Sequence, residues 1–529
     1  MQADRASSLP RRIASIAWLL VLLPAFGQAA GDTTWSADSD SGRYEASLAP
    51  RDGRVRIGEI QDWVLTLRTA EDDAPLRDVR IGVGGGMPGH GHGLPTQPAA
   101  TEYLGDGQHV IAGVKLSMPG EWVLAFGIET ANGRDRIVFE MQVKPWQDDR
   151  ERLLQSLLLD DSVLPPPSPS NRVADNPEAA ELGERLFFDP RLSANGKLSC
   201  ASCHQPERFF TDGLPRAQGM QETARNTPTV IGAGHLKWFY WDGRRDSLWS
   251  QALLPLEAAD EMGSDRVSIT RLVGKDKQLR KAYEAAFGPW PLDKAEQSLP
   301  VAAGPFGDPS LRAAWSAVDR RSQQSVNRVF ANLGKALAAW QRTLPNPVSR
   351  FDRYVAAVLS PDESASKWLT ADERAGLELF LDEERTHCLR CHNGRWMTNG
   401  DFHNIGTGTF TGDRLDFGRV FGIRALSMDE FSCLGPYSDA RPESCKEMRF
   451  LNRGSHVPLE GAFKVPSLRN LKHTAPYMHD GRFEDLESVI AFYRTPPSGE
   501  AAHELFPLDI DDEEAAQLIA FLNSLTWED

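Results

Sequence analysis

The pentapeptide Cys-x-x-Cys-His, which occurs twice, constrains this chain more than any other feature. The two copies comprise Cys200, Cys203 and His204, and Cys388, Cys391 and His392. Two thiols at this spacing form thioethers with the two vinyl groups of one porphyrin, and the histidine that follows binds the iron of the same ring. A zinc ribbon would place its cysteine pairs closer together and would not need a histidine after each pair. The two copies therefore predict two covalent haem c groups, with separate metal or thiol sites as the alternative.

The charge balance and the N-terminus indicate an exported protein. The formal net charge is -16, which argues against nucleic acid as a partner and favours a cationic protein. Two arginines precede an apolar run from Ile13 to Phe26, and small residues follow near Ala29. This pattern predicts a signal peptide over residues 1–29, with an uncleaved anchor as the alternative. Because c-type haem is attached outside the cytoplasm in bacteria, we expect a periplasmic protein that has no membrane segment after cleavage.

Hydrophobic periodicity predicts a β domain at the start of the mature chain. From residue 35 to residue 146, apolar side chains alternate with polar ones, as they do at Trp63, Leu65 and Leu67. Turn signals such as Asp-Gly and Asn-Gly separate the apolar runs. We expect an all-β sandwich in this part.

A different pattern follows the β domain. Residues 147–174 form a linker that contains a proline-rich stretch. Beyond it the apolar spacing becomes helical, and each Cys pair lies near the start of its own segment. We therefore predict a multidomain chain in which two mainly α-helical cytochrome c-like domains, at 175–345 and 346–529, follow the β-sandwich.

Several short blocks in the helical part resemble the bacterial di-haem cytochrome c peroxidase and MauG superfamily. The blocks are Leu186–Ser193, Arg225–Thr229, Trp241–Arg244, Glu261–Gly263, Phe463–Asn470 and Thr474–Gly481. The resemblance covers about 175–529 of the chain. It implies that the first haem is peroxidatic and that the second exchanges electrons.

The resemblance makes the sixth ligand of each iron decisive, because only an open position binds peroxide. Classical members close the first haem at rest with a histidine shortly before the Arg-Asn pair, where this chain has Gln218. No histidine lies between His204 and His235. Met220 is an alternative ligand on the same segment. We expect a five-coordinate first haem that has His204 as its only protein ligand and is ready for peroxide without prior reduction.

The resemblance also implies an acid–base residue for cleavage of the peroxide bond. In the family, a glutamate follows the tryptophan of the Trp-Asp-Gly-Arg block at a fixed distance, and Glu261 stands at the matching distance from Trp241. Gln251 and Pro255 match two further positions of the distal pocket. A solvated surface charge is the alternative reading of Glu261.

For the second haem, the resemblance implies a tyrosine ligand. Classical peroxidases have a methionine at a fixed distance after the Tyr-x-His-x-Gly block, and this chain has Tyr493 there, as MauG-like members do. Met478 or His479 is the alternative. A phenolate stabilises ferric and higher oxidation states, so the pair His392 and Tyr493 implies a high-valent state shared by the two haems. Trp241 is expected between the haems as a relay, or else as a core residue.

The resemblance implies a calcium ion between the haems as well. Its ligands correspond to the side chain of Asn226 and the backbone carbonyls of Thr474 and Pro476. Oxygen donors suit this hard cation. Asn226 capping a turn is the alternative.

Two features stand outside the haem sites. Cys433 and Cys445 remain after haem attachment, and an oxidising compartment favours a disulfide between them, with an oxidisable free thiol as the alternative. The β domain resembles YtkA-like domains and contains Met87, His90 and His92 on a glycine-rich loop. These side chains are a candidate copper site, or else incidental residues on a mobile loop.

Three functions are compatible with these features. The leading hypothesis is a periplasmic di-haem peroxidase that reduces hydrogen peroxide with electrons from a small c-type cytochrome or a cupredoxin. The second is a MauG-like oxidase that modifies a partner protein by long-range electron transfer. MauG has a surface tryptophan two positions before its second Cys pair, whereas this chain has Thr386, which argues against the same exit route. The third, a non-catalytic electron-transfer cytochrome with a copper-binding module, would have no use for Glu261 beside an open iron.

Overall fold

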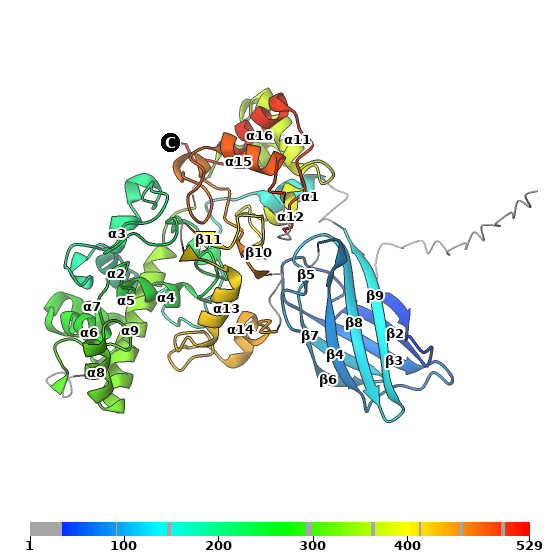
Figure 1. Ribbon diagram of the computed structural model, residues 1–529, viewed down its shortest axis with the longest axis horizontal. Helices are drawn as coiled ribbons and strands as arrows, with labels where there is room; N and C mark the ends of the chain where they lie inside the picture. Colours follow the sequence, from blue (N-terminus) through cyan, green and yellow to red (C-terminus); the bar gives the residue numbers. More distant parts are fainter. Residues whose placement is uncertain are drawn as a thin grey trace, which may run out of the picture.

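The computed structural model describes residues 34–90, 92–144, 150–292, 298–346, 348–360, 365–411, 414–454, 459–498 and 503–528. The predicted signal peptide, residues 1–29, lies outside these ranges. Figure 1 shows a body of β-strands beside two helical parts, with α13 (Arg419–Ser427) and α14 (Lys446–Arg449) between the first helical part and the strands. Among the helices in the described ranges, none has the length and apolar character that crossing a membrane requires.

Two antiparallel sheets form the N-terminal part, in the strand orders β1-β2-β3-β7-β6 and β5-β4-β8-β9. The strands are β1 (Trp35–Asp38), β2 (Tyr44–Pro50), β3 (Gln61–Thr69), β4 (Arg80–Met87), β5 (His92–Gly93), β6 (Ala99–Gly105), β7 (Gln108–Val114), β8 (Gly120–Thr130) and β9 (Gly133–Val143). In β3, the side chains of Trp63, Leu65 and Leu67 are fully buried, as their alternation predicts. Inward-facing side chains from both sheets share one core, which confirms the predicted all-β fold.

Each helical part is built around a helix pair that a glycine brings close together. The pairs are α2 (Pro177–Phe187) with α9 (Arg320–Gln341), and α11 (Ala371–Leu381) with α16 (Asp512–Ser524). Gly183 in α2 lies against the backbone of Ala336, and Gly376 in α11 lies against the backbone of Gln517. A Cβ at either glycine would overlap a carbonyl oxygen of the partner helix. The same packing device thus occurs in both parts, which fits two similar mainly helical domains.

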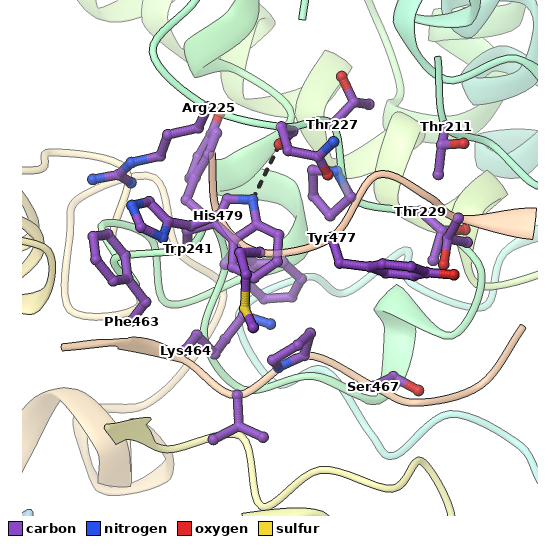
Figure 2. Close-up of a pocket in the computed structure, with 18 of the residues that line it drawn as sticks. Thr211, Arg225, Thr227, Thr229, Trp241, Phe463, Lys464, Ser467, Tyr477 and His479 are labelled. Carbon is purple, nitrogen blue, oxygen red and sulfur yellow. Dashed lines mark hydrogen bonds between the residues drawn. The ribbon is translucent and has the colours of Figure 1, made fainter. Parts of the chain in front are cut away.

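The remaining helices and short strands surround these pairs. They are α1 (Arg150–Leu157), α3 (Cys200–Cys203), α4 (Leu248–Gln251), α5 (Leu254–Glu257), α6 (Arg266–Lys275), α7 (Lys277–Phe287), α8 (Pro309–Ala317), α10 (Arg350–Val358), α12 (Cys388–Cys391), α15 (Leu486–Arg494), β10 (Phe402–His403), β11 (Phe410–Thr411), β12 (Arg414–Leu415) and β13 (Phe463–Lys464). A cavity lies among them, and Figure 2 shows part of its wall.

The segment that was expected to be a linker contains α1. Its residues Leu154 and Leu157 are fully buried in the core of the second helical part. The guanidinium of Arg469 donates a hydrogen bond of 2.8 Å to the carbonyl of Leu157. Apolar residues at helical spacing explain why this stretch packs as a helix, and only the residues beyond it carry the predicted proline-rich character.

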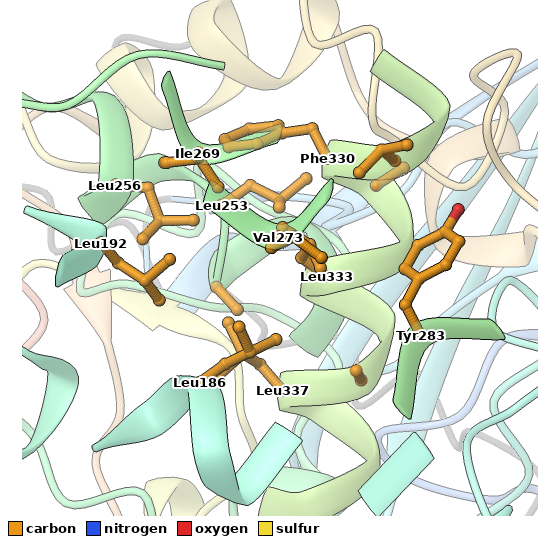
Figure 3. Close-up of a cluster of buried hydrophobic side chains, with 14 of the residues drawn as sticks. Leu186, Leu192, Leu253, Leu256, Ile269, Val273, Tyr283, Phe330, Leu333 and Leu337 are labelled. Carbon is orange, nitrogen blue, oxygen red and sulfur yellow. The ribbon is translucent and has the colours of Figure 1, made fainter. Parts of the chain in front are cut away.

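The first helical part has the larger core. Figure 3 shows Leu333 and Leu337 of α9 facing side chains from α2, α6 and the segments near α4 and α5. Asn176 caps α2 and Asp319 caps α9, each by accepting a hydrogen bond from a backbone N–H in the first turn. This core holds α3, which carries the first Cys pair, against the cavity.

Candidate active site

One cavity of about 740 Å³ reaches both Cys-x-x-Cys-His motifs. Its wall includes all six residues of the motifs, namely Cys200, Cys203, His204, Cys388, Cys391 and His392. Burial raises the pKa of Cys200 and of Cys388 to about 12, so both thiols are neutral in the absence of a partner. A cavity with a thiol pair at each of two places fits two covalently attached porphyrins.

The two histidines are oriented in the same way. The Nδ1 atom of His204 lies 3.1 Å from the carbonyl oxygen of Phe210, and Nδ1 of His392 lies 3.1 Å from that of Met397. Each Nδ1–H donates to its carbonyl, so that Nε2 carries the lone pair for a metal. Burial lowers the pKa of His204, and it lowers the pKa of His392 to about 4. Both rings are therefore neutral and suited to bind haem iron.

Glu261, Gln251 and Pro255 line the cavity on the side of the first motif. Burial raises the pKa of Glu261 to about 7, while nearby Arg244 opposes the rise. The loop of Glu261 follows α5 and is closed by hydrogen bonds from its own backbone to Pro255 and Ala258. A carboxyl group that is half ionised near neutral pH can both accept and return a proton. The structure thus brings together the three residues that the resemblance singled out.

The segment of Gln218 is a hairpin that packs on the Glu261 loop through its backbone. The N–H of Met220 donates to the carbonyl of Glu261 at 2.8 Å, and the N–H of Gln221 donates to that of Asp260 at 3.1 Å. The side chains of Gln218 and Met220 are exposed, Met220 to 40%. Neither residue is part of the described cavity wall. The hairpin therefore supports the Glu261 loop and directs no ligating side chain into the cavity.

Trp241 lies in the cavity wall (Figure 2), where it contacts segments from both helical parts. Its Nε1–H donates to the carbonyl of Asn226 at 3.0 Å, which is the bond dashed in Figure 2. Its own carbonyl accepts a 2.7 Å hydrogen bond from the N–H of Lys464. Its role as a relay between the haems stays a prediction.

Arg225 fixes the segments on either side of Trp241. It forms ion pairs with Asp242 at 2.9 Å and with Asp416 at 2.7 Å. Arg244 pairs with Asp242 at 3.2 Å. The sequence marked Arg225 only as part of a motif, because Asp242 belongs to a different block and Asp416 lies 191 residues away along the chain.

Tyr493 projects from α15 into the part of the cavity near the second motif. Burial, followed by the neighbouring Cys391 and Cys388, raises its pKa well above the usual value. The charges that act on His479 are instead those of Asp480, Asp416, Arg225 and Arg482. His479 is also stacked on Phe463 with ring centroids 3.6 Å apart. These surroundings favour Tyr493 over His479 as the candidate second ligand of an iron held by His392.

The predicted calcium ligands Asn226, Thr474 and Pro476 all line this cavity. The side-chain amide of Asn226 donates to the carbonyl of Leu214 at 2.9 Å, which leaves its oxygen as a donor for a cation. Within the described ranges, no group of three or more His, Cys, Asp or Glu side chains is placed to hold a metal ion. The calcium site depends mainly on carbonyl oxygens and stays a prediction.

Two predictions outside the cavity have different outcomes. Cys433 and Cys445 form a disulfide, as the oxidising compartment led us to expect. Of the candidate copper ligands, Met87 is 2% exposed and packs in the core of the β-sheets, and the copper site stays a prediction. The side chains of His90 and His92 lie outside the described residues.

Sequence reasoning missed a buried pair beside the second motif. Nδ1 of His403 lies 2.6 Å from a carboxylate oxygen of Glu504, and both residues line the cavity. It also missed Lys464, which lines the cavity and whose pKa burial lowers to about 8. Lys464 belongs to the Phe463–Asn470 block, whereas His403 and Glu504 lie outside every block, and only the folded chain brings the three to the cavity wall.

Comparisons with known proteins agree with this arrangement. The family model described as "Di-haem cytochrome c peroxidase" matches residues 177–358. The methylamine utilization protein MauG of Methylophilus methylotrophus is 31% identical over 66% of this chain and 82% of its own length. The cytochrome-c peroxidase IdrP2 of Denitromonas iodatirespirans is 31% identical over 67% of this chain and 83% of its own.

A solved structure shares the fold. It is a variant of the diheme peroxidase BthA from Burkholderia thailandensis, which superimposes with a TM-score of 0.50 at 22% identity and covers 70% of this chain and 92% of that chain. Two haem-attachment motifs on one cavity, together with relatives of this identity and coverage, settle the family. The chain belongs to the di-haem cytochrome c peroxidase and MauG family of oxidoreductases.

Proposed function

We propose that the protein is a periplasmic peroxidase that reduces hydrogen peroxide at the haem held by Cys200, Cys203 and His204. Glu261 carries the proposal, because its side chain lines the cavity beside this motif and its pKa is raised to about 7. Reducing one peroxide to two waters consumes two electrons and two protons. When bound, the haems supply the redox chemistry, while the chain supplies the proton transfer and the positions of the reactants.

In the proposed reaction, Glu261 transfers the proton. Glu261 in its ionised form accepts a proton from the peroxide oxygen that approaches the iron, and it returns the proton to the departing oxygen. Gln251 and Pro255 border the same space. The exposed positions of Gln218 and Met220 support a first haem whose only protein ligand is His204. Peroxide would then react with the resting ferric protein.

The second site and its link to the first complete the proposal. His392 and Tyr493 would hold the second iron, and Trp241 would relay electrons between the two haems. A calcium ion held by Asn226, Thr474 and Pro476 would brace the wall between them. A small periplasmic c-type cytochrome or a cupredoxin would supply the electrons, and the net charge of -16 favours a basic donor.

A MauG-like oxidase that acts on a partner protein is the second candidate, and the 31% identity to MauG supports it. Thr386 argues against the same exit route. It is only 4% exposed and donates a hydrogen bond of 2.5 Å to the carbonyl of Leu379. The position that would have to present an aromatic side chain to a partner is therefore an interior polar contact.

Turnover separates the two functions. Peroxide is added to the all-ferric protein and the absorption spectrum is followed, after which reduced cytochrome c or a reduced cupredoxin is supplied. A rapid spectral change followed by repeated oxidation of the donor is expected. A rapid spectral change with no oxidation of either donor would contradict the peroxidase and favour the oxidase.

A further inference from the structure

The β domain contacts the helical parts directly, and one of its loops reaches the cavity. Residues 115–119, which connect β7 to β8, enter this contact, and Met118 at 1% exposure lines the cavity. The indole N–H of Trp122 donates to the carbonyl of Met118 at 2.9 Å and fixes this connection to β8. The β domain thus contributes to the wall of the cavity.

A buried ion pair anchors this contact. Nζ of Lys115 in the β domain pairs with Oδ1 of Asp401 in the second helical part, and the side chains of both are 8% exposed. The other carboxylate oxygen of Asp401 is buried and has no hydrogen-bond partner among the described residues. Lys115 is therefore the cation that compensates this buried carboxylate, with Arg419 as a more distant positive charge.

Asp401 is the residue directly before the strand pair that supports Trp241. Its carbonyl accepts a 2.9 Å hydrogen bond from the N–H of Val465. The following strand β10 pairs with β13, with Phe402 opposite Lys464. The N–H of Lys464 then donates to the carbonyl of Trp241 at 2.7 Å. An unbroken series of contacts therefore runs from Lys115 to the backbone of Trp241.

A second series of contacts, through Arg419 and Phe402, joins β10 to the turn that contains Trp241. The guanidinium of Arg419 stacks on the ring of Phe402 at 3.9 Å and donates to the carbonyls of Asp242 and Gly243. Gly243 approaches Phe402 so closely that a Cβ there would overlap the ring. The strand pair and the Trp-Asp-Gly-Arg turn are thus packed as one unit. A shift of Asp401 would therefore change the position of Trp241.

We propose that Lys115 and Asp401 are positioning residues for electron transfer between the two haems, and that the β domain acts through this pair to hold Trp241 in place. The inference rests on the proposed role of Trp241 as the relay. It assigns the β domain a part in the reaction of the haem domains. Among the described hydrogen bonds and ion pairs, none joins Lys115 or Asp401 to a proposed iron ligand, and the effect of the pair passes through β10 and β13.

The test compares Lys115→Met with the control Asn452→Ala. Asn452 also joins the two parts, by donating from its side chain to the carbonyl of Leu94 at 3.3 Å, but no described contact joins it to Trp241. In the holoprotein, a limiting pulse of reductant is followed by optical recording of the redistribution of electrons between the haems. Hydrogen exchange of the Lys464 and Val465 amides is measured in parallel.

We expect Lys115→Met to slow the redistribution by about ten- to a hundredfold and to speed exchange at both amides, because small displacements of a relay are costly. Lys115→Arg should keep the wild-type redistribution rate and the wild-type amide exchange. Asn452→Ala should change neither of these two quantities. Wild-type redistribution and exchange in Lys115→Met, even with a lowered melting temperature, would overturn the proposal and leave the pair a purely structural contact.

A double variant keeps the test decisive if Lys115→Met does not fold. Lys115→Met with Asp401→Asn removes both charges and leaves no unpaired buried ion. It should fold, take up both haems and still show slow redistribution, whereas a wild-type rate would overturn the proposal. Because the redistribution needs no peroxide, an absence of peroxide turnover in the wild type would contradict the proposed peroxidase without affecting this result.

Discussion

Replacing Glu261 by Gln removes the acid–base group and keeps the shape of the side chain. The rate constant for reaction of peroxide with the all-ferric protein is the measurement, taken from pH 5 to pH 9 by stopped-flow absorption. In the wild type, the rate should rise with pH through a midpoint near 7, because only the ionised carboxylate accepts a proton. At pH 5 it should be about a hundredfold below its alkaline plateau, since about 1% of the groups are ionised there.

The size of the effect in the variant follows from the chemistry. Loss of a general base lowers rates by about 10²–10⁴-fold, so Glu261→Gln should be slow and nearly independent of pH. Glu222→Gln is the matched control, because it makes the same change of charge on an exposed residue of the adjacent hairpin. A Glu261→Gln protein with the wild-type rate and the wild-type midpoint would refute the assignment.

Glu261→Gln should raise the free energy of unfolding above neutral pH, although it lowers the rate of reaction with peroxide. The rise of the Glu261 pKa from 4.5 to about 7 corresponds to about 3 kcal/mol at 1.36 kcal/mol per pKa unit. The folded state binds this proton more tightly than the unfolded state, so the group lowers the free energy of unfolding as the pH rises from about 4.5 to about 7. Glu261→Gln should therefore be more stable than the wild type at pH 8 and about equal to it at pH 4, as urea denaturation would show.

Three further changes test other parts of the account. Tyr493→Phe should alter the absorption spectrum of the second haem and leave the first unchanged, and an unaltered second haem would exclude Tyr493 as a ligand. Trp241→Phe keeps an aromatic ring but loses the hydrogen bond to Asn226, so it should slow electron redistribution between the haems while the initial reaction with peroxide stays fast. Replacing Cys433 and Cys445 by serine should lower the free energy of unfolding by about 3 kcal/mol in urea denaturation, for a loop that spans 12 positions, and no change would show that the crosslink does not stabilise the fold.

Local patterns in the sequence predicted the elements that depend on local spacing. The alternation of Trp63, Leu65 and Leu67 identified a strand with one buried face, and β3 has that face. The two Cys-x-x-Cys-His motifs identified α3 and α12 as haem-attachment segments, and both face one cavity. Glu261, which the resemblance singled out by its distance from Trp241, lines the same cavity, and its catalytic role stays a prediction.

Contacts between segments that are distant along the chain could not be predicted from the sequence. Lys115 and Asp401 are separated by 286 residues, and nothing in either local pattern marks the other as its partner. The sequence did not predict the helix α1, because the prolines of its segment indicated a linker. The burial of α1 depends on the core of the second helical part. The burial of Met87 in the β core likewise depends on strands that are distant along the chain.

The spin states of the resting ferric protein test the central claim most directly, namely that the haem held by His204 has no second protein ligand. Electron paramagnetic resonance of the untreated protein reports each iron separately. We expect one high-spin signal from the first haem and one low-spin signal from the haem held by His392 and Tyr493. Two low-spin signals of equal weight would contradict it, because an iron with two protein ligands has no position at which peroxide can react.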